Sequence, residues 1–121
     1  MMMRARLILL LVAALALGVA ACNSSPAGPG DPKAGEAVYT QSCASCHMAD
    51  GSGKTAAAAR PTAASFVGSA NVLSKSDSVL LASITNGTTG NIGTMPAWGA
   101  TLSSQQRNDV LAYIRATFGE K

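Results

Sequence analysis

The sequence has few of the side chains on which many classes of function depend. Its 121 residues include five aromatic side chains and one histidine, and charged residues make up only 12%. No cluster of lysine or arginine occurs after residue 6, so the chain lacks the basic patch and the stacking surface that nucleic-acid binding requires. No segment alternates polar and apolar residues for long enough to indicate a β-strand. We therefore expect a helical protein without a nucleic-acid partner.

Hydrophobic residues are also unevenly distributed. They make up 48% of the chain, and residues 1–21 are hydrophobic apart from Arg4, Arg6 and Gly18. From residue 22 onward only twenty large apolar side chains remain, because most of the other hydrophobic residues are alanines. A core of this size rarely holds a domain together without a disulfide, a metal or a cofactor.

Residues 1–21 have the pattern of a secretory signal peptide. Two arginines form a basic start, residues 7–17 are an unbroken apolar run, and small residues precede Cys22. The apolar stretch is short for a membrane span. The four residues that end at Cys22 resemble a bacterial lipobox, which implies cleavage before Cys22 and lipidation of its sulfur. Ordinary cleavage after residue 21, which leaves a free thiol, is the alternative.

A linker follows the signal sequence. Residues 23–30 contain no large apolar side chain and are rich in glycine, proline, serine and asparagine. We expect residues 22–30 to form a flexible tether and residues 31–121 to form one domain. The lipid on Cys22 would then hold this domain at a membrane, facing the periplasm or the cell exterior.

Two of the three cysteines form a motif with the single histidine. Cys43 and Cys46 are separated by two residues, and His47 follows directly. This spacing is typical of covalent haem attachment, in which the thiols bond to the two vinyl groups and the adjacent imidazole binds the iron. A thioredoxin-like pair would need a strand–helix–strand pattern that the sequence does not show, and a structural zinc site needs four ligands. A simple disulfide between Cys43 and Cys46 would leave the small core unsupported.

Few residues are candidates for a second axial ligand. After residue 21 only Met48 and Met95 carry a thioether. Met48 follows His47 directly and is therefore held on the same side of the ring. Met95 lies in a segment that its glycines and Pro96 indicate to be a loop, and such a loop can bring the sulfur to the opposite face. We expect Met95 to be the ligand, with ordinary core packing as the alternative.

These motifs resemble those of a class I mono-haem cytochrome c of the short bacterial kind, including the modules attached to terminal oxidases. The resemblance covers residues 31–118, and residues 94–98 form its second motif. It implies an all-α fold of three to five helices around one covalently bound haem c, with His47 and Met95 as axial ligands. It also implies electron transfer, no enzymatic activity, and redox partners such as an oxidase, a reductase or a dehydrogenase.

The resemblance also implies which residues surround the haem. Trp98 matches an aromatic side chain that packs near it, and Tyr39 falls in the same surroundings. Pro61 matches a proline whose carbonyl accepts a hydrogen bond from the histidine ligand, although Arg60 stands where the family often has glycine. In the family the first and last helices cross where a small residue faces an aromatic one, and Gly35 and Tyr113 match those positions.

Helix boundaries are readable from the residues themselves. Asp31 and the proline after it predict a helix start, and residues 76–86, with a glycine just beyond them, predict a second helix. Residues 103–106 form a capping box before a last helix. The apolar stripe of that helix contains Val110, Leu111, Tyr113, Ile114 and Phe118.

Two functions of other classes remain open. A haem-based gas sensor or a peroxidase-like enzyme would need an open sixth position on the iron, which Met95 argues against. A lipoprotein binding module with a Cys43–Cys46 disulfide and no haem would leave His47 and the small core unexplained.

Overall fold

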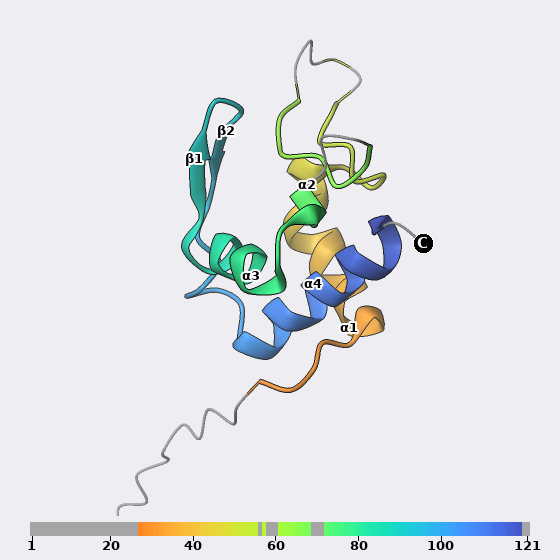
Figure 1. Cartoon of the computed structure of the whole chain (residues 1–121), viewed down its shortest axis with the longest axis vertical. Coiled ribbons are helices and arrows are strands. Elements are labelled where there is room, and N and C mark those ends of the chain that lie inside the picture. The colour runs from red at the N-terminus through yellow and green to blue at the C-terminus, as the bar shows by residue number, and fades with distance from the viewer. Residues whose placement is uncertain (1–26, 56, 58–60, 69–71, 120–121) are drawn as a thin grey trace, which may run out of the picture.

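The computed structural model describes residues 27–55, 57, 61–68 and 72–119 (Figure 1). The expected signal peptide and Cys22 lie outside these residues. No helix within the described ranges is long and apolar enough to cross a membrane. The elements in chain order are α1 (Pro32–Val38), η1 (Tyr39–Cys43), α2 (Ala44–His47), η2 (Val72–Ser74), α3 (Asp77–Asn86), β1 (Thr88–Gly90), β2 (Gly93–Met95) and α4 (Ser104–Phe118).

The first helical segment begins as the sequence predicts. The Asp31 carboxylate accepts a hydrogen bond of 2.9 Å from the Lys33 amide, and Pro32 occupies the first turn, where no amide proton is needed. α1 is followed directly by η1 and α2. η1 is a π-helical turn, in which the Ala44 amide donates to the Tyr39 carbonyl five residues earlier. The extra residue in this turn rotates the residues that follow it about the helix axis.

α1 crosses α4 at Gly35, and this crossing is the main helix contact of the domain (Figure 1). A Cβ atom on Gly35 would overlap the backbone carbonyl of Asp109 and lie 2.9 Å from the Cβ of Tyr113. The expected close approach of Gly35 and Tyr113 is therefore confirmed. The capping box is also confirmed, because the Ser103 side chain accepts from the Gln106 amide and the Gln106 side chain accepts from the Ser103 amide.

The chain just before α1 is bound to α4. The Gly28 amide donates to the Gln105 side chain at 2.7 Å, and the Asn108 side chain donates to the Gly28 carbonyl at 2.9 Å. The Asp31 amide donates to the carboxylate of Asp109, a buried residue, at 2.8 Å. Within the described residues, hydrogen bonds to α4 are therefore already made at Gly28, three residues before the expected start of the domain.

α3 covers the other side of α4. Its bounds confirm the helix expected over residues 76–86, and Gly87 ends it with a φ of 72°. The buried core that joins the helices is small, as expected from the composition. It consists of Tyr39, Phe66, Leu73, Leu80, Ile84, Val110, Leu111 and Ile114.

Arg115 of α4 connects that helix to the segment around η2. Its guanidinium donates to the carbonyl oxygens of Leu73 and Lys75, the latter at 2.7 Å, and pairs with the Asp77 carboxylate at 2.8 Å. The ion pair is largely exposed and contributes at most about 1 kcal/mol. The hydrogen bonds to carbonyl oxygens matter more, because they fix the backbone of η2 and of Lys75 against α4.

The expectation that the domain contains no strand was wrong in one place. β1 and β2 pair antiparallel, with Thr88 opposite Met95 and Gly90 opposite Gly93. Each strand has three residues, and all but Met95 are exposed, so no alternation of buried and exposed residues marks them in the sequence. The fold is otherwise helical, in agreement with the predicted class.

The helix crossing yields a stability prediction. We expect Gly35→Ala to lower the free energy of unfolding by about 2 kcal/mol or more, because the added methyl forces α1 away from α4. Gly28→Ala is the matched control, since a Cβ at Gly28 would make only an ordinary contact of 3.4 Å with the Gln105 side chain, and it should change stability by less than about 0.5 kcal/mol. Chemical denaturation of the holoprotein measures both values, and equal stabilities for the two variants would contradict the crossing.

Candidate functional site

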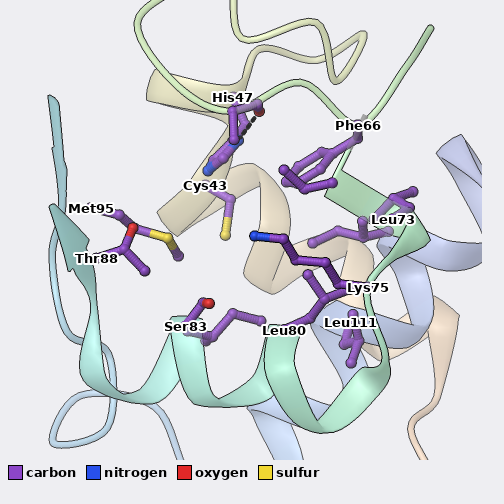
Figure 2. A pocket seen from close by; sticks show the side chains of 14 residues that line it. Cys43, His47, Phe66, Leu73, Lys75, Leu80, Ser83, Thr88, Met95 and Leu111 are labelled. Carbon is purple, nitrogen blue, oxygen red and sulfur yellow. Dashed lines mark hydrogen bonds between the residues drawn. The ribbon is translucent and has the colours of Figure 1, made fainter. Parts of the chain in front are cut away.

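Two adjoining cavities lie between α2, α3 and the β1–β2 hairpin. The larger has a volume of about 600 Å³, and the smaller has a volume of about 140 Å³. Both are lined by Cys43, His47 and Met95, so three of the predicted site residues face one continuous space (Figure 2). Cys46 and Trp98 line the larger cavity only. The sequence motifs that lie about fifty residues apart are thus brought together by the fold.

The two thiols lie at one wall of this space. Cys43 is half-buried, Cys46 is exposed, and both are free thiols in the structure. Burial raises the pKa of the Cys43 thiol to about 11, and the neighbouring Cys46 contributes in the same direction. A redox-active cysteine pair needs the opposite, a thiol pKa lowered toward neutrality. The environment of Cys43 therefore disfavours thioredoxin-like chemistry.

His47 is held in a single orientation. Its Nδ1 atom lies 2.9 Å from the carbonyl oxygen of Ala64, and its ring stacks on Phe66 with a centroid distance of 4.5 Å (Figure 2). A carbonyl oxygen only accepts hydrogen bonds, so Nδ1 must carry the proton and Nε2 is left with a free lone pair in the neutral ring. Burial lowers the pKa of His47, while the bond to Ala64 opposes this shift. The neutral ring is the form that ligates a metal ion.

The chain reverses directly after His47. Met48 has φ 63° and ψ 159°, a strained conformation for a residue other than glycine, and it ends α2. Its carbonyl accepts a hydrogen bond of 2.6 Å from the Tyr39 hydroxyl, and the His47 carbonyl accepts one of 3.0 Å from the Gly53 amide. These bonds stabilise the strained turn. The segment that follows it leads to Ala64 and Phe66, which contact the His47 ring. The Met48 side chain lines neither cavity.

Met95 is positioned by the β1–β2 hairpin and by hydrogen bonds to the end of α3. The Trp98 amide donates to the Ile84 carbonyl at 2.9 Å, and the Gly99 amide donates to the Thr85 carbonyl at 3.0 Å. A Cβ on Gly87 would lie 2.5 Å from the Met95 carbonyl, so glycine is required for this close approach. The Met95 sulfur points into the space that the His47 ring also enters (Figure 2).

Two of the residues expected around the haem do not line these cavities. Pro61 lines neither cavity, and the carbonyl that approaches His47 Nδ1 belongs to Ala64 instead. The carbonyl beside His47 thus lies three residues further along the chain than predicted. The Thr62 amide donates a hydrogen bond to the Gly53 carbonyl, so the chain reaches the histidine only after Thr62. Tyr39 also lines neither cavity, because its ring packs on Tyr113, with a centroid distance of 5.2 Å.

Sequence reasoning missed Ala64 and Phe66, which orient His47. An alanine that acts through its backbone carbonyl leaves no signal in its own side chain. Phe66 is one of only two phenylalanines in the chain, and its rarity in so small a core is the one signal that pointed to it.

The residues around the space fit a haem group. A cavity of about 600 Å³ lies in the range for cofactor sites, and the described residues that line it include no Asp, Glu, Lys or Arg. Two thiols lie at its wall, a free imidazole lone pair is available at His47, and the Met95 thioether enters from another element. This donor set matches His/Met ligation of a covalently attached haem.

Comparison with known proteins agrees with this geometry. The model of the family described as cytochrome C oxidase, cbb3-type, subunit III matches residues 30–114. The chain therefore belongs to this family of cytochrome c domains. It is a mono-haem cytochrome c domain, of a family that transfers electrons and carries covalent haem c.

Two curated relatives are similar to the chain. The gluconate 2-dehydrogenase cytochrome c subunit of Pantoea cypripedii is 37% identical over 95 residues, which make up 74% of this chain and 21% of that protein. Cytochrome c6 of Rippkaea orientalis is 33% identical over 91 residues, which make up 75% of each chain. No solved structure matches.

The hydrogen bond that supports the turn after His47 is testable through its pH dependence. Burial raises the pKa of Tyr39, whose side chain is 2% exposed, above its ordinary value near 10. Above pH 10 the unfolded chain releases this proton and the folded chain keeps it, so the free energy of unfolding falls as pH rises. We expect Tyr39→Phe to cost about 1 kcal/mol at pH 7 and to remove this alkaline loss, which reaches about 1.4 kcal/mol per pH unit.

Tyr113→Phe is the matched control, because Tyr113 is only partly buried and packs on Tyr39. Denaturant unfolding of the reduced holoprotein between pH 7 and 11 gives all three profiles. If wild type and Tyr39→Phe show the same alkaline slope, the proton on Tyr39 does not stabilise the turn.

Proposed function

We propose that this protein carries one electron on a haem bonded to Cys43 and Cys46, with His47 and Met95 as the axial ligands of the iron. The supporting observation is the convergence of both thiols, the His47 ring and the Met95 thioether on the larger cavity, whose described lining residues carry no Asp, Glu, Lys or Arg. Haem c supplies an iron that exchanges one electron between its ferrous and ferric states. No bond of a substrate needs to be made or broken.

Each protein group has a separate part in this function. Ala64 and Phe66 keep the His47 ring neutral and oriented, so that Nε2 remains free for the iron. The thioether of Met95 is a soft ligand that favours the ferrous state. The uncharged lining adds to this preference, because it disfavours the additional charge of the ferric state. Both effects raise the reduction potential.

We further propose that the domain is tethered to a membrane on its extracytoplasmic side through a lipid on Cys22. The apolar run, the small residues before Cys22 and the linker after it support this location. The names of the relatives support a redox partner of the dehydrogenase or oxidase type. The partner would exchange electrons at the mouth of the larger cavity, where the described lining residues carry no charge and favour contact without strong electrostatic steering.

The cysteine assignments are testable together. We expect Cys43→Ala/Cys46→Ala to contain no covalent haem, so that any haem in it is released on denaturation. We also expect it to lose helical structure, because the small core cannot hold the domain without the cofactor. Intact mass and an alkaline pyridine spectrum measure the covalent haem, and circular dichroism measures the helices. A colourless wild-type protein with the mass of polypeptide and lipid alone would refute the assignment.

Cys22→Ser is the matched control for the third cysteine. It should keep the covalent haem and the fold, lose the acyl mass, and move from the membrane fraction to the soluble fraction. Retention in the membrane with unchanged mass would argue against the lipid anchor and leave the haem assignment intact.

The role of Met95 is tested by Met95→Ala. We expect this variant to keep its haem, to have a lower reduction potential, and to bind carbon monoxide in the ferrous state, because the sixth coordination position is opened. Met48→Ala is the control, since Met48 lines neither cavity and should retain the wild-type spectrum. An unchanged spectrum and potential in Met95→Ala would remove Met95 from the site.

A further inference from the structure

Residues 28–31 lie against α4, and we call this segment the strap. Besides the hydrogen bonds described above, the Pro29 carbonyl accepts one of 3.1 Å from the Gln105 side chain. A Cβ on Gly30 would overlap the backbone carbonyl of Asn108, so the two backbones are in direct contact there. The strap is therefore part of the folded domain, and the free tether ends where the strap begins.

The strap lies at the end of the domain away from the larger cavity. It lies at the bottom of Figure 1, beside the starts of α1 and α4, whereas α2 and the tip of the β1–β2 hairpin lie toward the top. α1, η1 and α2 follow one another without a break from Pro32 to His47. A helical segment of this length rises on the order of 20 Å, so the cavity that His47 lines lies well away from the strap.

The chain between Cys22 and the strap is short. Only the five residues 23–27 separate Cys22 from Gly28, and this stretch spans at most about 20 Å even when it is fully extended. A domain of about ninety residues is about 30 Å across. Without the strap, the free chain would run to Pro32 and could reach about 34 Å. The strap thus makes the tether shorter than the domain that it holds.

From these lengths we infer that the strap holds the domain with one end on the membrane surface and with the larger cavity turned away from the lipid. The inference rests on the proposed lipid on Cys22 and on the proposed haem. The face that meets the lipid surface consists of the strap and the first turns of α1 and α4. Turning the domain over would lift Gly28 about 30 Å above the lipid, beyond the reach of the tether.

The face assigned to the lipid surface has no apolar patch of its own. The large hydrophobic side chains that are exposed among the described residues are Val67, Val79 and Ile92, and none of them belongs to the strap or to the first turns of α1 and α4. Membrane insertion of this face would need such side chains. The orientation therefore depends on the length of the tether, and a longer tether should abolish it.

This orientation restricts the redox partner that can reach the haem. An electron carrier that stays inside the bilayer or among the headgroups is separated from the cavity by most of the height of the domain. The partner that fits is a redox protein domain outside the bilayer, whose electron-exchanging group stands at a height of about 30 Å or is free in solution.

The experiment uses the lipidated holoprotein in phosphatidylcholine vesicles, whose headgroups carry no net charge. One electron acceptor is a ferrocenium group linked to a phospholipid headgroup, and the other is a water-soluble ferrocenium. In each reaction one electron passes from the ferrous haem to the ferrocenium, so the haem iron is oxidised and the ferrocenium is reduced. Stopped-flow absorption of the haem measures both rates.

The length of the tether is tested by an insertion between Ser25 and Pro26. About twenty added glycine and serine residues raise the root-mean-square span from about 13 Å to about 28 Å and leave the strap unchanged. We expect the rate with the headgroup ferrocenium to rise at least about fivefold, because electron transfer weakens exponentially with distance and the longer tether lets the domain turn over. The rate with the soluble ferrocenium should stay within about twofold of wild type.

The strap is tested with the tether unchanged. Gly30→Ala places a methyl group against the Asn108 carbonyl and should release the strap, so the rate with the headgroup ferrocenium should rise about twofold or more. Gly28→Ala is the matched control, because a Cβ there makes only an ordinary contact of 3.4 Å, and it should keep both wild-type rates. Circular dichroism checks that both variants remain folded.

Each result bears on a different part of the inference. Equal headgroup rates in wild type and the insertion variant would refute the orientation, while the lipid and the covalent haem would stand. Equal headgroup rates in Gly30→Ala and Gly28→Ala would refute the role of the strap. If intact mass shows wild-type protein without acyl chains or without haem, the proposed anchor or the proposed cofactor fails instead, and the mass itself distinguishes the two.

Discussion

The close crossing of α1 and α4 at Gly35 is the constraint on which the site depends. The glycine allows the two backbones to touch, and the contact fixes the direction in which α1 leads into η1 and α2. The π-helical turn at η1 then rotates the chain between Tyr39, which packs into the core, and His47, which faces the cavity. The helix contact thus sets the position of the histidine, although neither Gly35 nor Asp109 touches the cavity.

The two halves of the site are built by different means. The histidine half is a loop that folds back over α2, where the Ala64 carbonyl and the Phe66 ring hold His47. The methionine half is a hairpin that hydrogen bonds to the end of α3. Because the halves come from separate segments, the two residues proposed as axial ligands are each positioned by hydrogen bonds of their own. Such an arrangement suits a cofactor that is inserted after the chain is made.

Much of this site was predictable because its chemistry is local in the sequence. Cys43, Cys46 and His47 form a continuous motif, and the helix caps at Asp31 and Ser103 involve residues within one turn. The remainder depends on contacts between distant segments. The carbonyl of Ala64 acts through the backbone, and the short strands around Met95 are exposed on both faces, so neither leaves a periodic pattern in the sequence.

The hydrogen bonds that attach Gly28 and Asp31 to α4 join parts of the chain nearly eighty residues apart. These contacts cannot form until the last helix has been synthesised, because their partners are Gln105, Asn108 and Asp109. Non-local pairings of this kind slow folding, because a long stretch of chain must be closed before they form. A chain that stops before the last helix lacks these partners, and Gly28 and Asp31 are then left without their attachment to the rest of the domain.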